Sequence, residues 1–227
     1  DNRQSLHFKQ LFDSIKFFEF NNLHHEHISY GTLNDSDGNP FKTRDGGTKP
    51  LGELFDETYE YIKNINSDLE DSTIKQLANS VLTFSDLITN RKTDYKFDLE
   101  KFTNVNGKTG IYVQYAQVRA KKLQQSIAEQ KNEIENIVLS DVDKQLLSQL
   151  FMFGYFLEQS SSLNEPHHLA NYLYDISNSF NQFYEHEKLS EIKDINHLSS
   201  KLYLINLFLT TSENVMFCLG MKPVDKM

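Results

Sequence analysis

Four stretches in the C-terminal half of the chain carry apolar residues at intervals of three and four, and this pattern constrains the fold more than any other. The stretches cover residues 109–139, 140–159, 165–186 and 195–219. The interval matches an α-helix with one buried face, so each stretch predicts an amphipathic helix. Residues 160–164 break the pattern, Pro166 suits a first helical turn, and Gly220 suits a helix end. We expect a compact helical bundle.

The N-terminal half has a more mixed pattern. Helical periodicity is found in three segments, residues 1–20, 51–65 and 74–88. Short extended or alternating segments are found at residues 27–33 and 94–103. A loop rich in Asp, Gly, Asn and Thr covers residues 34–49. The fold class predicted for the whole chain is therefore mainly α.

The boundary between the two halves is predicted where turn-forming residues gather. Residues 90–93 read Asn-Arg-Lys-Thr, and residues 104–108 read Asn-Val-Asn-Gly-Lys. Such residues favour turns and connections between domains. We therefore divide the chain into a first part, residues 1–95, and a helical domain, residues 96–227.

Composition narrows the function classes. The chain has 227 residues, of which 38% are hydrophobic, and a formal net charge of −9. No apolar run approaches the ~20 residues that span a bilayer, and the first residues lack the pattern of a signal peptide. A single cysteine, Cys218, excludes an intrachain disulfide; in its apolar surroundings we expect a buried thiol in a cytoplasmic protein.

The negative charge argues against a protein that coats DNA or RNA without specificity, because such binding needs clustered cations. It does not argue against a protein that recognises one folded RNA at a few unpaired bases. Such a protein needs only a local basic cluster, and Lys121 and Lys122 are one.

Residues 112–119, Tyr-Val-Gln-Tyr-Ala-Gln-Val-Arg, place Tyr112, Tyr115 and Arg119 on one face of a helix. Two phenols and a guanidinium can stack on unpaired bases and pair with phosphate. Two plainer interpretations stay open at this point. The tyrosines can belong to a core stripe, and Arg119 can form a surface ion pair with an acidic neighbour.

Residues 38–47, Gly-Asn-Pro-Phe-Lys-Thr-Arg-Asp-Gly-Gly, place Lys42 and Arg44 on either side of Thr43. The flanking glycines let backbone amides approach a ligand, so a triphosphate would suit the loop. A solvated turn with incidental charges is the alternative. The three histidines His24, His25 and His27 lack a Cys or carboxylate at a recognised ligand spacing, so we predict no metal site.

Taken in order, these segments resemble class I arginyl-tRNA synthetases over nearly the whole chain. Residues 112–119 are similar to the anticodon-binding helix of that family, and residues 38–47 to its divergent KMSKS-type signature loop. The opening residues 1–12 resemble the helix after a strand of the catalytic Rossmann-like domain. Residues 165–184 resemble a late helix of the family, and residues 219–227 resemble its ending. Of the family label DALR, only Ala116 and Arg119 are retained.

The resemblance implies a fold and a function. Residues 1–95 would form the end of a Rossmann-like class I catalytic domain, with the KMSKS-like loop and connecting helices. Residues 96–227 would form a DALR-type α-helical bundle that binds the anticodon. The full-length enzyme would attach arginine to its tRNA with ATP and Mg²⁺. Its partners would be arginine tRNA, arginine and ATP, and we expect a monomer that binds neither membrane nor DNA.

The same resemblance assigns roles to individual residues. Lys42 and Arg44 would be catalytic, offsetting charge on the α-phosphate and pyrophosphate as arginyl-adenylate forms, and with Thr43 they would bind ATP. Gln4 would contact the substrate arginine through its amide oxygen. The expected anticodon-binding residues are Tyr112, Tyr115, Arg119, Phe180 and Met227.

By this resemblance, the first half of the active site would lie outside this chain, because the sequence has no His-x-Gly-His-like ATP motif. We therefore expect this fragment to be inactive alone and to bind no cofactor. The alternative function is a helical protein-interaction or regulatory module derived from a synthetase. A third interpretation, another class I synthetase such as one for cysteine, fits the loop and the Met ending less well.

Overall fold

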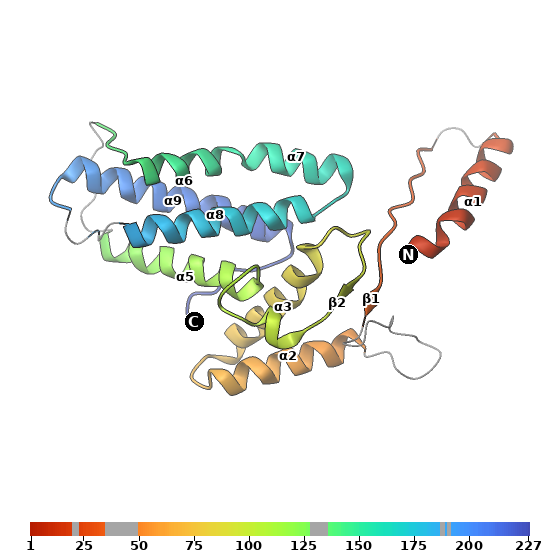
Figure 1. The fold of residues 1–227 in the computed structure, drawn as a ribbon, viewed down its shortest axis with the longest axis horizontal. Helices are drawn as coiled ribbons and strands as arrows, with labels where there is room; N and C mark the ends of the chain where they lie inside the picture. Colours follow the sequence, from red (N-terminus) through yellow and green to blue (C-terminus); the bar gives the residue numbers. More distant parts are fainter. Residues whose placement is uncertain (20–22, 35–49, 128–135, 187–188, 190–191) are drawn as a thin grey trace.

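The computed structural model describes residues 1–19, 23–34, 50–127, 136–186, 189 and 192–227. Its described residues are mainly helical, as predicted. Figure 1 shows a bundle of long helices, a second helix pair beneath it, and a first helix that stands apart. Among the described residues, no helix is both long enough and apolar enough to cross a membrane.

Five helices from the C-terminal half form the bundle. They are α5 (Gly110–Ile127), α6 (Asp141–Phe151), α7 (Phe153–Leu163), α8 (His167–His186) and α9 (Ile195–Cys218). Their apolar faces meet in one large core that includes Tyr172, Phe180 and Phe208, all fully buried. A helical bundle was predicted for this region, and that prediction is confirmed.

Two predicted helix extents were wrong. The helix predicted over residues 109–139 is described from Gly110 to Ile127, and residues 137–139 are not helical. The helix predicted over residues 140–159 divides at Met152, whose amide donates to the Gln149 carbonyl and tightens the turn. The ends follow local chemistry. Ser140 and Asp143 form a capping box, and Gly220 takes the positive φ of 73° that its position predicts.

The second helix pair consists of α2 (Leu51–Ile65) and α3 (Asp71–Leu87), close to the predicted segments. A smaller core joins α3 to α5 through residues such as Val81 and Val118. The two helices approach closely because Gly110 has no side chain: a Cβ there would lie 2.2 Å from the Ser80 carbonyl oxygen. Helix α5 therefore packs into both cores.

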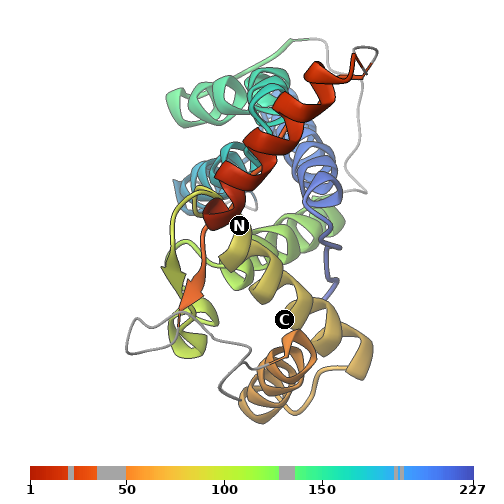
Figure 2. The same cartoon turned by 90° about the vertical axis from the view of Figure 1, so that its right-hand side faces the viewer.

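The N-terminal segment is held to the rest by backbone pairing. Strand β1 (Leu33–Asn34) pairs in parallel with β2 (Tyr95–Lys96). Both strands are shorter than predicted. The segment that contains β2 ends early because Asp98 accepts from the Lys101 amide and starts the short helix α4 (Leu99–Phe102). The 3₁₀ turn η1 (Asn2–Gln4) leads into α1 (Ser5–Phe17), which has no buried residue. Helix α1 stands apart from the bundle in Figure 1 and lies in front of it in Figure 2.

The loop after α3 contacts the turn between α7 and α8. Lys92 Nζ lies 3.0 Å from Glu165 Oε1, and Arg91 Nε donates to the Asn164 carbonyl at 2.8 Å. Asn171 Nδ2 donates to the Ile88 carbonyl at 3.2 Å. These polar contacts tie the first half of the chain to the bundle.

The prediction that the Cys218 thiol is buried is wrong. The thiol is exposed, because Cys218 is the last residue of α9 and lies beyond the buried pair Val215 and Met216.

Candidate nucleic-acid interface

Helix α5 presents different side chains on its two faces. Thr109 accepts a hydrogen bond from the Tyr112 amide at 3.1 Å and so supports the first turn. Val113, Ala116 and Ala120 are completely buried, which fixes the rotation of the helix. Tyr112, Tyr115 and Arg119 consequently lie on the other side, which faces α8 and solvent, as their spacing predicts.

Arg119 is the centre of this surface. Its guanidinium lies 4.3 Å from the ring centre of Tyr115 and 4.8 Å from that of Tyr184 on α8. Arg119 Nη1 donates to Asn181 Oδ1 at 3.1 Å and lies 3.6 Å from Glu185 Oε1. The cation is thus held by two aromatic rings and one amide. The surface ion pair considered for Arg119 is present, but the Glu185 side chain is 70% exposed, so solvent screens it.

Tyr112 continues the surface toward the start of α5. Its hydroxyl donates to Asn178 Oδ1 at 3.2 Å, and its ring centre lies 5.3 Å from that of Tyr174. Lys108 Nζ lies 5.1 Å from the Tyr174 ring centre. We call the set Tyr112, Tyr115, Arg119 and Tyr184 the tyrosine face. Its phenol rings, guanidinium and nearby asparagine amides are the groups that bind unpaired bases by stacking and by base-edge hydrogen bonds.

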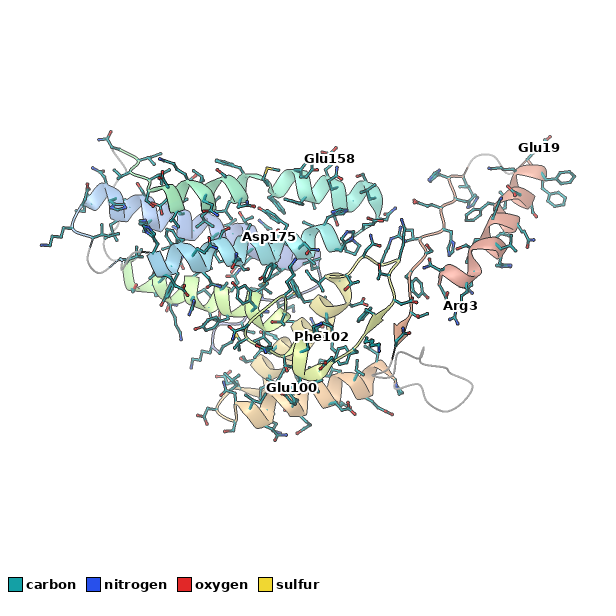
Figure 3. All side chains as sticks on the ribbon, in the orientation of Figure 1. Arg3, Glu19, Glu100, Phe102, Glu158 and Asp175 are labelled. Carbon is teal, nitrogen blue, oxygen red and sulfur yellow. The ribbon has the colours of Figure 1, made fainter. Side chains whose placement is uncertain are left out.

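Two ionisable groups at one end of the tyrosine face, Tyr174 and Asp175, have raised pKa values. Burial raises the pKa of Asp175, and Lys108 opposes that rise. The pKa of Tyr174 is also raised, mainly by burial and then by Tyr112 and Asp175, which keeps the phenol neutral. Figure 3 shows Asp175 on α8 within the bundle. The acidic Asp175 at this end of the surface favours stacking of bases over strong attraction of phosphate.

Phe180 is not on the tyrosine face. It is fully buried, and its ring stacks on Phe208 with centres 4.2 Å apart and planes 12° from parallel. The residue that reaches the surface is Tyr184, one turn later on α8, which is 39% exposed. Sequence reasoning missed Tyr184, because Tyr184 lies four residues after Phe180 and therefore shares its side of α8. Helical spacing alone does not separate the buried ring from the exposed one.

Met227 lies at the flank of α5. It is half-buried against the smaller core, which contains Ile111 and Val118. These two residues are four before and three after Tyr115, so this flank borders the tyrosine face. Gln114 holds the tail in place: its Nε2 donates to the Lys222 carbonyl at 2.7 Å, and its Oε1 accepts from the Val224 amide at 3.0 Å.

The predicted basic cluster is partly engaged. Lys121 Nζ lies 2.6 Å from Asp225 Oδ1, so this cation is paired with the C-terminal tail. Lys122 is exposed.

The structure says less about the predicted catalytic and substrate-binding residues than about the tyrosine face. Lys42, Thr43 and Arg44 lie outside the described residues. Gln4 is exposed at the start of α1 and makes no side-chain capping hydrogen bond. The structure therefore does not bring Gln4 together with the tyrosine face, and it leaves the predicted arginine and ATP contacts as predictions.

A cavity of about 620 Å³ lies elsewhere, between α2, α3 and the strand pair. Its lining is largely apolar, and its polar groups include Tyr95, which donates to Asp86 Oδ1 at 2.7 Å. Burial raises the pKa of Tyr95 strongly, with the Asp86 hydrogen bond as the second cause. Of the predicted site residues that the structure describes, none lines this cavity.

Comparison with known proteins is consistent with both halves of this description. The family described as "tRNA synthetases class I (R), catalytic domain" matches residues 1–99, and the family described as "DALR anticodon binding domain" matches residues 113–227. The second match covers half of the chain.

Curated relatives share substantial sequence identity. The arginine–tRNA ligase of Francisella tularensis subsp. novicida is 37% identical over 205 residues, covering 86% of this chain and 35% of that protein. The arginine–tRNA ligase of Alcanivorax borkumensis is 34% identical, covering 100% of this chain and 41% of that protein. The chain therefore spans about two fifths or less of the length of these relatives.

Solved structures show the same fold. The arginyl-tRNA synthetase of Thermus thermophilus aligns with a TM-score of 0.75 at 20% identity, covering 88% of this chain and 35% of that one. The enzyme from Plasmodium falciparum aligns with a TM-score of 0.74 at 23% identity, covering 100% of this chain and 40% of that one. The family matches and the identity to the curated relatives together show that the chain belongs to the arginyl-tRNA synthetase family, with a class I catalytic-domain segment followed by a DALR anticodon-binding domain.

Proposed function

We propose that the tyrosine face binds the anticodon of arginine tRNA, and that the chain functions as part of an ATP-dependent arginine–tRNA ligase. One observation carries the proposal: the Arg119 guanidinium lies over two tyrosine rings that come from different helices. This arrangement holds flat aromatic surfaces beside a fixed cation, which suits unpaired bases in an RNA loop. The match of residues 113–227 to an anticodon-binding family supports it independently.

The residues would have distinct roles. Tyr115 and Tyr184 would stack on anticodon bases, and Arg119 would hold the two rings and offer its remaining N–H groups to base edges or phosphate. Tyr112 would extend the stack toward Tyr174. Phe180 would support Tyr184 without contacting the RNA, because the Phe180 ring is buried and its centre lies 6.5 Å from that of Tyr184.

Met227 would close one flank of the face. It is held there by the tail, whose path is fixed by Gln114. A thioether can pack against bases as well as against aromatic rings. In this proposal the tyrosines stack on the bases, Arg119 holds the tyrosine rings in position, and Met227 bounds one side of the binding surface.

Binding would require a small rearrangement at Arg119. Glu185 is the acidic neighbour of its guanidinium, at 3.6 Å, and it is mostly exposed. An exposed pair of this kind contributes about 0–1 kcal/mol, so a phosphate or base can replace it at little cost.

The test is a titration of the chain with arginine tRNA, and with the same tRNA altered at its central anticodon base, at one fixed salt concentration. Selective binding of the unaltered tRNA is expected. Tyr115→Ala and Tyr184→Ala should each lose about 1–3 kcal/mol of binding free energy, the cost of one lost base stack. Tyr155→Ala is the matched control, since Tyr155 is an exposed tyrosine on α7. Equal loss in all three variants would contradict the proposal.

The same titration separates the alternative function. A helical module that interacts with proteins predicts that Tyr112→Ala, Tyr115→Ala and Arg119→Ala change no affinity for tRNA. Binding that is equal for both tRNAs, with no effect of these variants, would favour that module over the ligase.

We further propose that residues 1–95 belong to the catalytic part and residues 96–227 to the anticodon-binding part. Lys42, Thr43 and Arg44 would bind the ATP phosphates with Mg²⁺, and Gln4 would contact arginine. The match of residues 1–99 to a class I catalytic-domain family supports the use of ATP.

Because the chain lacks a His-x-Gly-His-like motif, it should not form arginyl-adenylate by itself. ATP–pyrophosphate exchange should stay at the level of a blank reaction, while a full-length arginyl-tRNA synthetase assayed in parallel should be active. Exchange above the blank would show that this chain holds a complete active site.

A further inference from the structure

Two imidazoles and a carboxylate meet at the start of α8, away from the tyrosine face. Glu165, His167 and His168 each offer one ligand atom, and these atoms all lie within 4.8 Å of one another. The turn before them sets up the meeting: Asn164 takes a left-handed conformation, with φ 53° and ψ 39°, and brings Glu165 against the first residues of the helix.

The distances approach those of a metal centre. Glu165 Oε2 lies 3.5 Å from His168 Nε2 and 4.0 Å from His167 Nδ1. Ligand atoms around a tetrahedral Zn²⁺ with bonds of about 2.0–2.2 Å lie roughly 3.3–3.6 Å apart. The first distance already fits, and the second needs a shift of a few tenths of an ångström. Both are too long for a good hydrogen bond between these groups.

The two histidine nitrogens lack hydrogen bonds. His167 Nδ1 and His168 Nε2 are shielded from solvent, and neither has a hydrogen-bond partner. Buried polar atoms without partners are costly, so their convergence on one carboxylate oxygen calls for a ligand. A neutral imidazole is the form that binds a metal.

The neighbouring cation Lys92 pairs with one carboxylate oxygen of Glu165 and leaves the other oxygen to the histidines. Lys92 occupies Glu165 Oε1 at 3.0 Å, while the histidines face Oε2. Asn90 Nδ2 lies 3.4 Å from Oε2, and Arg91 is directed to the Asn164 carbonyl and to the Ser29 carbonyl. Lys92 and Asn90 can therefore orient the carboxylate from outside, as the hydrogen-bonded neighbours of metal ligands do. The positive charge of Lys92 also weakens the site.

We propose that Glu165, His167 and His168 form a binding site for a divalent first-row transition metal such as Zn²⁺, with the remaining coordination position filled by water. Two histidines and a carboxylate are a ligand set that these metals favour. The bound ion would join the start of α8 through Glu165 and Lys92 to the loop after α3. It would therefore stiffen the contact between the catalytic-domain segment and the anticodon-binding domain.

The test uses Co²⁺ as a spectroscopic probe and the chain without a histidine tag. Titration with Co²⁺ should give the visible absorption of a ligated ion at one equivalent, and Zn²⁺ should displace it and raise the melting temperature. His167→Asn and His168→Asn should each weaken Co²⁺ binding by tenfold or more, roughly the loss of a ligand's contribution. Circular dichroism of each variant shows whether it is folded.

Two controls exclude other histidines. His186→Asn changes an exposed histidine at the far end of the same helix and should leave binding unchanged. Replacing His24, His25 and His27 together removes the competing cluster in the N-terminal segment. Binding that disappears in that triple variant, or that persists in both His167→Asn and His168→Asn, would overturn the proposal.

Lys92→Met gives a test in the opposite direction. Removing this cation frees Glu165 Oε1 and reduces repulsion, so Co²⁺ should bind more tightly than to the unaltered chain. No ion bound to other histidines would respond in this way. Unchanged affinity in Lys92→Met would contradict the role of Glu165 as a ligand.

Discussion

The N-terminal segment and the helical bundle both stack aromatic rings, yet in only one of them does the stacking build a core. In the segment, Phe8 stacks on His27 with centres 4.3 Å apart. In the bundle, Phe180 stacks on Phe208 at 4.2 Å. The bundle rings are fully buried, whereas no side chain described in residues 1–34 is buried. The comparison teaches that ring geometry alone is no measure of stability; the apolar area removed from water decides it.

The largest expected effect tests this difference directly. Phe208→Ala should lower the free energy of unfolding by about 3–5 kcal/mol, because it leaves a cavity in the main core. Phe8→Ala should cost less than about 1 kcal/mol, since its side chain is only half-buried and lies outside both cores. Chemical denaturation of both variants measures the two values. Similar losses would mean that the N-terminal segment contributes to the same cooperative unit as the bundle.

A buried ion pair gives the next effect. Lys201 Nζ lies 2.7 and 2.9 Å from the two carboxylate oxygens of Asp143, and the side chains are 2% and 0% exposed. Lys201→Met would leave the Asp143 carboxylate buried without its cation and should cost about 3–5 kcal/mol.

The matched control is Lys144→Met, which breaks an exposed pair with Asp141 on the same helix as Asp143. It should cost no more than about 1 kcal/mol. Thermal or urea unfolding compares the two variants, and a Lys201→Met protein as stable as the control would show that solvent reaches Asp143.

Alanine substitutions at two glycines, one in each region, compare how tightly the bundle and the N-terminal segment are held. A Cβ at Gly110 would lie 2.2 Å from the Ser80 carbonyl oxygen, and a Cβ at Gly31 would lie 2.6 Å from that of Thr93. Gly110→Ala must separate two packed helices and should cost about 1–3 kcal/mol. Gly31→Ala should cost less global stability, because the N-terminal segment can move aside.

Gly154→Ala serves as the control for both, since nothing lies within 4 Å of its added Cβ and its helix gains a better helix former. Amide exchange would show Gly31→Ala as faster exchange at Tyr95, whose N–H donates to the Thr32 carbonyl in the strand pair. Unfolding midpoints in the order Gly154→Ala, Gly31→Ala, Gly110→Ala, from highest to lowest, are expected; a reversal of the last two would refute the picture of a movable segment.

The smallest effect is a pH dependence of the same attachment. The Thr32 amide donates to Asp94 Oδ1 at 2.6 Å, and this hydrogen bond lowers the pKa of Asp94 below its ordinary 3.8. A depressed carboxyl pKa gives stability that is present above the ordinary value and is lost as pH falls through the lower folded value. Amide exchange at Thr32, corrected for its intrinsic pH dependence, should therefore lose protection below about pH 4, and Asp94→Asn should remove that pH dependence.

Sequence periodicity predicted most helices and could not predict which faces are covered. The apolar positions of α1 follow the helical repeat as well as those of α3 do, yet Leu6 and Leu11 are exposed and Leu77 and Val81 are buried. Periodicity reports which residues share a face, not whether another element lies against it.

The candidate site shows the same limit. Tyr112, Tyr115 and Arg119 were predicted to share a face because they lie on one helix, where spacing is sufficient. Phe180 was chosen from a second helix, and the rotation of that helix depends on the core, so the exposed residue is Tyr184. The cluster at Glu165 was not predicted at all, because its ligand atoms converge through the left-handed turn at Asn164 and not through a recognised ligand spacing.

The tail that passes Gln114 has a consequence for evolution. The Gln114 amide bonds the tail only through backbone atoms: its Nε2 donates to the Lys222 carbonyl and its Oε1 accepts from the Val224 N–H, while Nε2 also donates to Ser80 Oγ on α3. The exposed side chain at position 222 can therefore change freely without altering the path of the tail. Gln114 cannot, because its replacement would leave buried backbone groups without partners. We expect natural variants to retain Gln114 and to vary at position 222, because the tail is held through its backbone and not through its side chains.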